Sequence, residues 1–189
     1  MHRDELEHLI RAAGSLLSVE RLLIIGSQSI LGTFPEDRLP VEATLSQEVD
    51  IVPPDDADER LADLIDGTIG EQSQFHEMFG VYADGVSLAT ARLPQGWQRR
   101  LVPLTNANTR GVIGYCLDPA DLLVTKYLAH RPKDLAFCRA VLQAGLVDGE
   151  IVAKRIPTAP GSPEEHRLAL DALRRDLSPH PPKTHGPRL

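Results

Sequence analysis

Two acidic residues in a short apolar run are the first candidates for a catalytic or metal-binding role. Glu48 and Asp50 alternate with Val49 and Ile51, and this alternation predicts a strand with both carboxylates on one face. Two carboxylates held so close repel each other unless a cation lies between them. Carboxylate oxygens suit Mg²⁺, or the similar Mn²⁺, which keeps positions open for phosphate oxygens. The pattern therefore predicts a divalent metal site, the alternative being that both acids simply face solvent.

A glycine turn upstream offers a place for phosphate. Residues 22–25 form an apolar run that ends at Gly26, which predicts a buried strand followed by a tight turn. Ser27 and its neighbours then present hydroxyls and backbone N–H groups at the start of a short helix, expected over residues 29–32. Such a helix start attracts phosphate. If adjacent strands bring this turn beside the two carboxylates, the result is a site for phosphoryl or nucleotidyl transfer.

Two charged residues in the second half could add to that site. Lys126 lies on an otherwise rather apolar helix that is expected to begin at Asp118. Its stem can lie on the core while its ammonium reaches a phosphate, or the charge can simply reach solvent. Asp134 falls in the first turn of the next expected helix, where a capping role alone would explain an acid.

The first two motifs together resemble the signature of the nucleotidyltransferase superfamily. That signature is an apolar residue, a glycine and a small residue, then a spacer and acid–apolar–acid–apolar, matched here by residues 25–27 and 48–51. The resemblance implies an NTP substrate and a metal ion held by Glu48, Asp50 and a third acid on the following strand. Asp84 is the nearest candidate, although Asp-Gly is also a common hairpin-turn pair. The chain departs from the usual pattern in its longer spacer and in having Glu as the first acid.

A second resemblance covers residues 121–135. This stretch is similar to the downstream motif of AbiEii/MenT-type toxin nucleotidyltransferases, and closer to that of a related, poorly characterised nucleotidyltransferase group. In that group a lysine is followed by an alanine and then by Arg-Pro-Lys-Asp-Leu. In the toxins the lysine meets the nucleotide phosphates and a later acid assists the active site, which implies these roles for Lys126 and Asp134. The likeness also implies tRNA or another RNA as acceptor and an antitoxin protein as partner.

The elements that must position these residues predict an α/β fold. We expect a small mixed-sheet nucleotidyltransferase core over residues 1–117, a helical C-terminal region packed on it over residues 118–177, and a disordered tail over residues 178–189. In chain order, we also expect a first helix with Asp4 and Glu5 in its first turn and its apolar residues over 6–17, and a helix opened by the acids of 55–59 and ended by Gly67 and Gly70. An irregular stretch over 71–80, a strand or strand pair over 79–88, and strands over 99–104 and 111–117 should follow. We then expect a helix starting at Pro132, a short helix to Ile156, and a last helix capped by Ser162 and Glu165.

Composition excludes some classes of function. Only 4% of the 189 residues are aromatic, so stacking platforms for single-stranded nucleic acid are scarce. No apolar run approaches the length of a membrane span, and the two cysteines lack metal-ligand neighbours, which favours buried thiols in a reducing cytoplasm. Residues 1–91 hold 5 basic and 18 acidic residues, whereas residues 92–189 hold 15 and 9. The asymmetry suggests an acidic metal-binding half facing a basic half that meets polyphosphate or RNA, unless it is ordinary solvated surface.

The sequence therefore favours a metal-dependent nucleotidyltransferase that moves a nucleotide from an NTP to an acceptor. Glu48, Asp50 and Asp134 are the expected catalytic residues, and Gly26, Ser27 and Lys126 are expected to bind the nucleotide. One alternative is a non-catalytic member that binds a nucleotide or a partner protein through the same cleft. Another is an enzyme with the same chemistry that modifies a small molecule.

Overall fold

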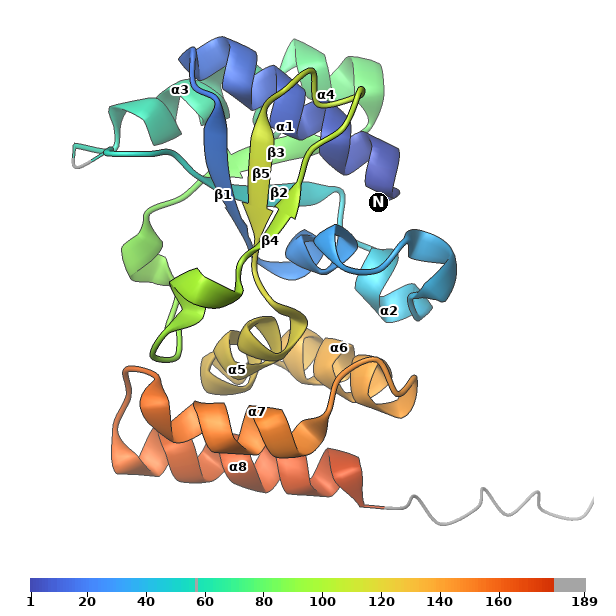
Figure 1. Cartoon of the computed structure of the whole chain (residues 1–189), viewed down its shortest axis with the longest axis vertical. Coiled ribbons are helices and arrows are strands. Elements are labelled where there is room, and N and C mark those ends of the chain that lie inside the picture. Colours follow the sequence, from blue (N-terminus) through green and yellow to red (C-terminus); the bar gives the residue numbers. More distant parts are fainter. Residues whose placement is uncertain (57, 179–189) are drawn as a thin grey trace, which may run out of the picture.

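The computed structural model of the chain describes residues 1–56 and 58–178, and a five-stranded mixed sheet lies at its centre (Figure 1). The strand order is β3-β2-β1-β5-β4, with β1 parallel to β5, β2 parallel to β3, and the other two pairs antiparallel. The strands are β1 (Arg21–Ile25), β2 (Glu48–Val52), β3 (Tyr82–Gly85), β4 (Val102–Leu104) and β5 (Ile113–Cys116). The predicted α/β fold with a mixed sheet is confirmed.

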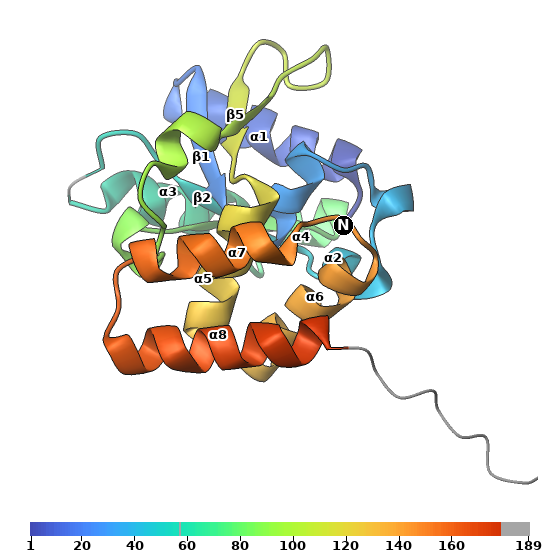
Figure 2. The ribbon, with the colours of Figure 1, turned by 60° about the horizontal axis from the view of Figure 1, so that its bottom comes forward.

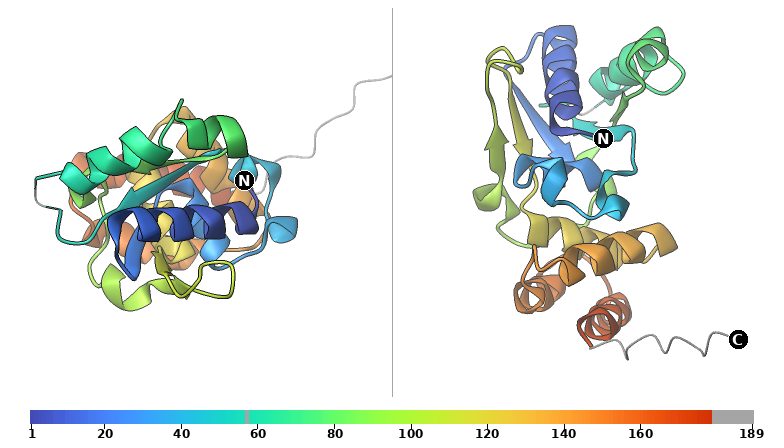
Figure 3. Two further views of the ribbon diagram at one scale, coloured as in Figure 1. Left: turned by 90° about the horizontal axis from the view of Figure 1, so that it is seen from above. Right: turned by 90° about the vertical axis from the view of Figure 1, so that its right-hand side faces the viewer.

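One face of the sheet is covered by helices from the first half of the chain. These are α1 (Arg3–Leu17), α3 (Arg60–Ile69) and α4 (Gln74–Phe79), which lie on the same side of the sheet (Figure 3). The apolar stripe of α1 packs on alternate residues of the central strands, so that Leu9 and Ile10 share a core with Ile24 and Val49. This packing fixes the face to which each strand residue points, and hence the direction of the acids between them.

The helical C-terminal region lies below the sheet as a separate layer in the view of Figure 1, and in front of it in Figure 2. It consists of α5 (Pro119–Ala129), α6 (Pro132–Gln143), α7 (Gly149–Arg155) and α8 (Pro163–Leu177). The expected caps are present: Asp118 accepts hydrogen bonds from two backbone N–H groups of α5, and Ser162 and Glu165 form a capping box on α8. Buried α5 residues such as Leu123 and Tyr127 pack against α6 and α8. The predicted helical C-terminal region is thus confirmed, while the expected disordered tail lies, apart from Ser178, outside the described residues.

Several expected boundaries were wrong. The stretch over 71–80 is not irregular, because it contains α4. The helix expected to open at residues 55–59 begins at Arg60, since Glu59 has a left-handed backbone with φ of 58° and therefore precedes the helix. That helix runs through Gly67 to Ile69. Residues 79–88 hold a single strand, and the strand expected over 99–104 starts only at Val102, after the 3₁₀ helix η4 (Trp97–Arg100).

A buried ionic network joins the two layers. The Asp121 side chain, on the first turn of α5, is fully buried and accepts hydrogen bonds from Arg100 at 2.8 and 3.0 Å and from Arg155 at 2.9 Å. Removal of the acid would leave the partly buried Arg100 guanidinium without a carboxylate partner, whereas Arg155 would keep its pair with Asp118. Leaving one charge of a buried pair unpaired is the costly way to break it.

We therefore expect Asp121→Ala to lower the free energy of unfolding by about 3 kcal/mol, measured by chemical denaturation. The control is Asp171→Ala, which removes an exposed acid that pairs with Arg174 on the surface of α8. That change should cost no more than about 1 kcal/mol, because exposed pairs are screened by solvent. Equal losses for the two variants would contradict the structural role given to Asp121.

Candidate active site

Three carboxylates meet at the edge of the sheet formed by β2 and β3. The parallel register places Asp84 directly opposite Asp50, and Tyr82 opposite Glu48. One carboxylate oxygen from each of Glu48, Asp50 and Asp84 lies within 4.8 Å of the other two. Asp84 lies within a strand, so the hairpin-turn alternative for it is wrong. The three acids predicted as metal ligands are thus brought together from two strands that are 30 residues apart in the chain.

The glycine turn lies against this triad. Ile25, at the end of β1, pairs with Asp50 on β2, and the chain turns at Gly26 with φ of 66° and ψ of −170°. This backbone region is almost exclusive to glycine. A Cβ atom at position 26 would lie 1.7 Å from the Asp50 carboxylate oxygen, so the turn can approach Asp50 only without a side chain. The helix that follows is the 3₁₀ helix η1 (Ser27–Gly32), which starts two residues earlier than expected.

The electrostatics of the triad favour a cation. Burial, together with the charges of Glu48 and Asp84, raises the pKa of Asp50 to about 6. Burial and the neighbouring Asp66 and Glu48 also raise the pKa of Asp84. Ionisation of both Asp50 and Asp84 is therefore costly without a compensating charge. Three hard oxygen ligands in such an arrangement fit Mg²⁺ or Mn²⁺.

On the other side of the turn, Lys126 bridges the sheet and the helical layer. Its ammonium donates hydrogen bonds to the Ser27 hydroxyl and to the Asp134 carboxylate, each at 2.8 Å, and lies 4.6 Å from the centre of the Phe137 ring. The lysine side chain is only 7% exposed, so the alternative that its charge simply reaches solvent is wrong. A buried ammonium beside the Gly26 turn is a fixed positive charge in a site of low dielectric constant.

Asp134 holds this lysine in place. Although burial raises its pKa, hydrogen bonds from Arg131 and Lys126 dominate and keep the pKa of Asp134 below its ordinary value. Arg131 reaches the acid through Nε at 2.5 Å, which leaves the terminal nitrogens of its guanidinium directed elsewhere. Asp134 therefore stays ionised and holds both Lys126 and Arg131. A capping role alone, which was the alternative for an acid in the first turn of α6, does not account for these two contacts.

A cavity of about 400 Å³ connects these groups, which is within the size range of small-molecule sites. Its lining consists of Ser27, Gln28, Glu42, Leu45, Ser46, Glu48, Asp50, Lys126, Arg131, Lys133, Asp134, Ala136 and Phe137. Gln28 is 1% exposed and donates to the carbonyl oxygen of Ala43 at 3.3 Å, so its amide oxygen points the other way. That oxygen has no hydrogen-bond partner among the described residues, which is unusual for a buried polar atom and points to a missing donor.

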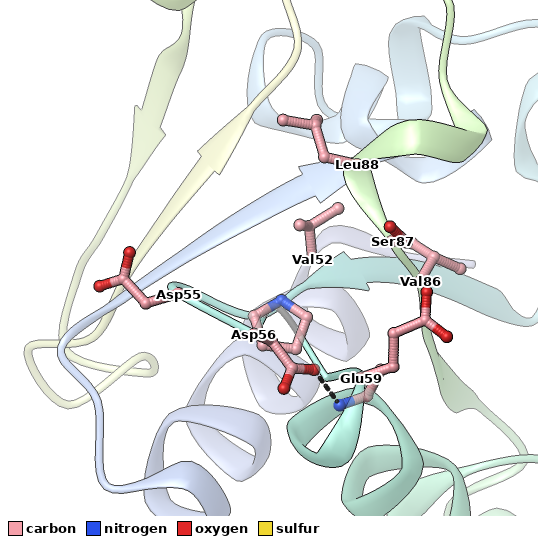
Figure 4. Close-up of a pocket in the computed structure, with 9 residues that line it drawn as sticks. Val52, Asp55, Asp56, Glu59, Val86, Ser87 and Leu88 are labelled. Carbon is pink, nitrogen blue, oxygen red and sulfur yellow. Dashed lines mark hydrogen bonds between the residues drawn. The ribbon is translucent and has the colours of Figure 1, made fainter.

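A larger hollow of about 500 Å³, lined by Asp55, Asp56 and Glu59, lies beyond the end of β2 (Figure 4). Of the residues that the structure describes, no member of the triad and no basic residue lines this hollow. The Asp56 carboxylate accepts hydrogen bonds from the first backbone N–H groups of α3, at Leu61 and Ala62, and so caps that helix. We assign the chemistry to the cavity beside the triad, because two acids of the triad, three cationic side chains and Ser27 of the glycine turn line it.

One residue of the site carried no signal in the sequence. Tyr82 donates a hydrogen bond from its hydroxyl to Glu48 at 3.2 Å, and burial together with the charge of Glu48 raises the pKa of Tyr82 to about 12. Glu has one more rotatable bond than the Asp that is usual at this position of the superfamily. The tyrosine compensates by fixing the carboxylate, in the way that outer-shell groups orient metal ligands.

We expect Tyr82→Phe to weaken the binding of Mn²⁺ by about 10- to 100-fold, the usual cost of losing such an outer-shell contact. The measurement is calorimetric titration of the purified protein with Mn²⁺. Tyr115→Phe is the control, because Tyr115 lies on β5 and lines neither the triad nor its cavity. If the two variants bind Mn²⁺ equally well, Tyr82 does not position Glu48.

A glycine turn after one strand, facing acids on the next two strands of a mixed sheet, is the arrangement of the nucleotidyltransferase class. Comparison with protein families supports this assignment independently, since residues 4–172 match the family described as "Nucleotidyltransferase of unknown function (DUF6036)". The match spans most of the chain, which therefore belongs to this family. No curated protein and no solved structure matches the chain. Within residues 1–56 and 58–178, no helix has the length and apolar character needed to cross a membrane.

Proposed function

We propose that the protein is a cytoplasmic, metal-dependent nucleotidyltransferase that moves a nucleotide from an NTP to an acceptor hydroxyl. The observation that carries the proposal is the meeting of Glu48, Asp50 and Asp84 beside the Gly26 turn, next to a cavity that is lined by Glu48, Asp50 and three cationic side chains. Acids and cations so arranged match what phosphoryl transfer requires, namely positioning of phosphates and stabilisation of the developing charge.

Each part of the site has a distinct task in this proposal. Glu48, Asp50 and Asp84 would hold Mg²⁺ or Mn²⁺, which when bound neutralises the charge that develops on the leaving pyrophosphate. The Gly26 turn and the Ser27 hydroxyl would approach the phosphates closely. Lys126 and Arg131, oriented by Asp134, would supply positive charge from the other side of the cavity.

The acceptor and the biological setting remain part of the proposal. On the likeness of residues 121–135 to the toxin motif, the acceptor is the 3′ end of tRNA or another RNA, and the partner is an antitoxin protein. A small-molecule acceptor would use the same chemistry. A non-catalytic member of the family would bind the nucleotide without turnover.

Incubation with Mg²⁺, each radiolabelled NTP and total tRNA or a panel of small hydroxyl compounds tests the proposal. We expect label to appear on an acceptor with one or more NTPs, and to be lost when EDTA is added. Calorimetry of NTP binding with and without Mg²⁺ separates the alternatives. Metal-independent binding with no transfer to any acceptor would overturn the proposed activity in favour of a binding role.

A further inference from the structure

A second cavity lies against three of the residues that line the first. It has a volume of about 380 Å³, and Asp50, Lys126 and Arg131 line both cavities. We refer to the first cavity as the Ser27 cavity and to the second as the Arg92 cavity. The Arg92 cavity is lined by Ile25, Asp50, Val86, Thr90, Ala91, Arg92, Thr125, Lys126, Ala129 and Arg131. Asp50, a candidate metal ligand, lines both cavities, so ligands bound in the two cavities would meet beside it.

The chemistry of the two linings differs. The Ser27 cavity contains the phosphate turn and three cations, namely Lys126, Arg131 and Lys133, which suits the high charge of a triphosphate. Neither Ser27 nor Lys133 lines the Arg92 cavity. Among its described lining residues, Arg92 is the one cation that does not also line the Ser27 cavity. The triphosphate therefore fits the Ser27 cavity, which leaves the Arg92 cavity for the second substrate.

The polar groups of the Arg92 cavity indicate what that substrate carries. Thr90 and Thr125 each donate their hydroxyl proton to a backbone carbonyl, at 2.8 Å, so their oxygens present lone pairs and accept from a ligand. Groups that donate to such oxygens include sugar hydroxyls. None of the residues that line this cavity is aromatic, so it offers no surface on which a base could stack.

Two arginine side chains supply hydrogen-bond donors to the Arg92 cavity. Arg92 is held by Glu165 at 2.6 Å and by the carbonyl oxygen of Leu128 at 2.6 Å, and Arg131 is held through Nε by Asp134. Both arginines line the Arg92 cavity, whereas the acids that hold them do not. A guanidinium has five N–H donors, so each arginine retains donors for a ligand anion, and its planar fork suits phosphate.

We infer that the Arg92 cavity binds the acceptor, and that the acceptor is a sugar hydroxyl with a phosphate attached close to it. The inference rests on the proposed function and adds the side of entry and the chemical class of the acceptor. In the reaction, the acceptor oxygen forms a bond to the α-phosphorus of the NTP held in the Ser27 cavity. The bond from that phosphorus to the bridging oxygen breaks, pyrophosphate leaves with the electron pair, and the hydroxyl proton passes to water.

Two exposed alanines allow a matched test of which cavity binds the NTP and which binds the acceptor. Ala129 lines the Arg92 cavity at the end of α5, and Ala136 lines the Ser27 cavity on α6. A tryptophan at either position fills one cavity, and both sites are exposed helical positions that tolerate a large side chain. Ala129→Trp should leave the Kd for the NTP within about threefold of the wild-type value but lower transfer by about 100-fold or more. Ala136→Trp should weaken NTP binding by about tenfold or more.

The opposite pattern, in which Ala129→Trp abolishes NTP binding and Ala136→Trp spares it, would overturn the assignment of the cavities while leaving the proposed function intact. Unchanged transfer by Ala129→Trp would also overturn it. A wild-type protein that neither binds an NTP nor transfers a nucleotide would instead defeat the proposed function itself. NTP binding is read by calorimetry and therefore does not depend on knowing the acceptor.

A series of acceptors tests the chemical class. The probes are a short oligoribonucleotide with a free 3′ hydroxyl, a nucleoside 5′-monophosphate, an uncharged nucleoside and an amine-bearing sugar. We expect transfer to one or both of the phosphate-bearing probes, at least about tenfold faster than to the other two. Use of the oligoribonucleotide alone would identify a nucleic-acid end, and use of the monophosphate would identify a small phosphorylated acceptor. Preference for the amine-bearing sugar or the uncharged nucleoside would refute the inference.

Discussion

Replacement of Asp50 by Asn should abolish nucleotidyl transfer and at the same time make the metal-free protein more stable. Asp50 is the central acid of the triad, opposite Asp84 in the sheet and next to the Gly26 turn. Asparagine keeps the shape but removes the charge that binds a cation. We expect the rate of transfer to fall by about 1000-fold or more, as when an essential electrostatic contact is lost from an active site.

The gain in stability follows from the raised pKa. The pKa of Asp50 in the folded protein is about 6, against an ordinary value of 3.8, because burial and the charges on Glu48 and Asp84 oppose its ionisation. The wild-type protein therefore loses stability relative to Asp50→Asn as the pH rises from about 4 to above 6. At pH 7 the difference should be on the order of 2 kcal/mol in favour of the variant, and below pH 4 it should vanish.

Thermal unfolding with EDTA at pH 4 and pH 7 measures this difference. Saturating Mg²⁺ should reverse the order at pH 7, because ligand binding to the folded state stabilises only the protein that binds it. Asp63→Asn, on the exposed part of α3, is the control. It should change neither the rate of transfer nor the dependence of stability on pH and Mg²⁺. If Asp50→Asn is less stable than the wild type in EDTA at pH 7, the three carboxylates do not repel one another in the metal-free protein.

The second large effect is expected at Gly26. In Gly26→Ala, the new methyl group would overlap the Asp50 carboxylate, since the ideal Cβ lies 1.7 Å from its oxygen, and alanine rarely adopts the backbone angles at this turn. Either the turn opens or Asp50 leaves the triad. Displacement of a catalytic group by about 1 Å can cost 100-fold in rate, so we expect at least that loss of transfer.

Gly145→Ala separates this effect from simple backbone strain. Gly145 also has a positive φ, of 68°, but nothing lies within 4 Å of a Cβ atom there. Both variants should lose about 1 kcal/mol or more of stability through strain, measured by denaturation, whereas only Gly26→Ala should lose activity and metal affinity. Comparable activity in the two variants would contradict the close approach of the turn to Asp50.

The sequence predicted the acids of the site better than their surroundings. Glu48 and Asp50 could be placed on one strand face because alternation is a local property of the chain. Asp84 could not be decided locally, since Asp-Gly is compatible with a strand or a turn. Its place was determined by the parallel pairing of β3 with β2, a contact between segments about 30 residues apart. Tyr82 became part of the site through the same pairing, which no local pattern reveals.

Other errors have similar causes. Helix α4 was missed because it is only six residues long, between Gly70 and Gly80, and its stability comes from packing of Phe75 and Phe79 around His8 of α1. The start of α3 was placed too early because acids are favoured in a first helical turn, whereas Glu59 adopts a left-handed backbone before it. The environment of Lys126 likewise depended on tertiary structure, because its partners, the half-buried Ser27 and the buried Asp134, come from different layers.

The central claim is that Glu48, Asp50 and Asp84 together hold one divalent cation beside the Gly26 turn. The most direct measurement is anomalous diffraction from crystals grown with Mn²⁺ and a non-hydrolysable NTP analogue. We predict an anomalous peak about 2.1 Å from one oxygen of each acid, with phosphate oxygens completing the coordination from the Ser27 cavity. A map in which the nucleotide is bound but no Mn²⁺ lies among the three carboxylates would contradict the account.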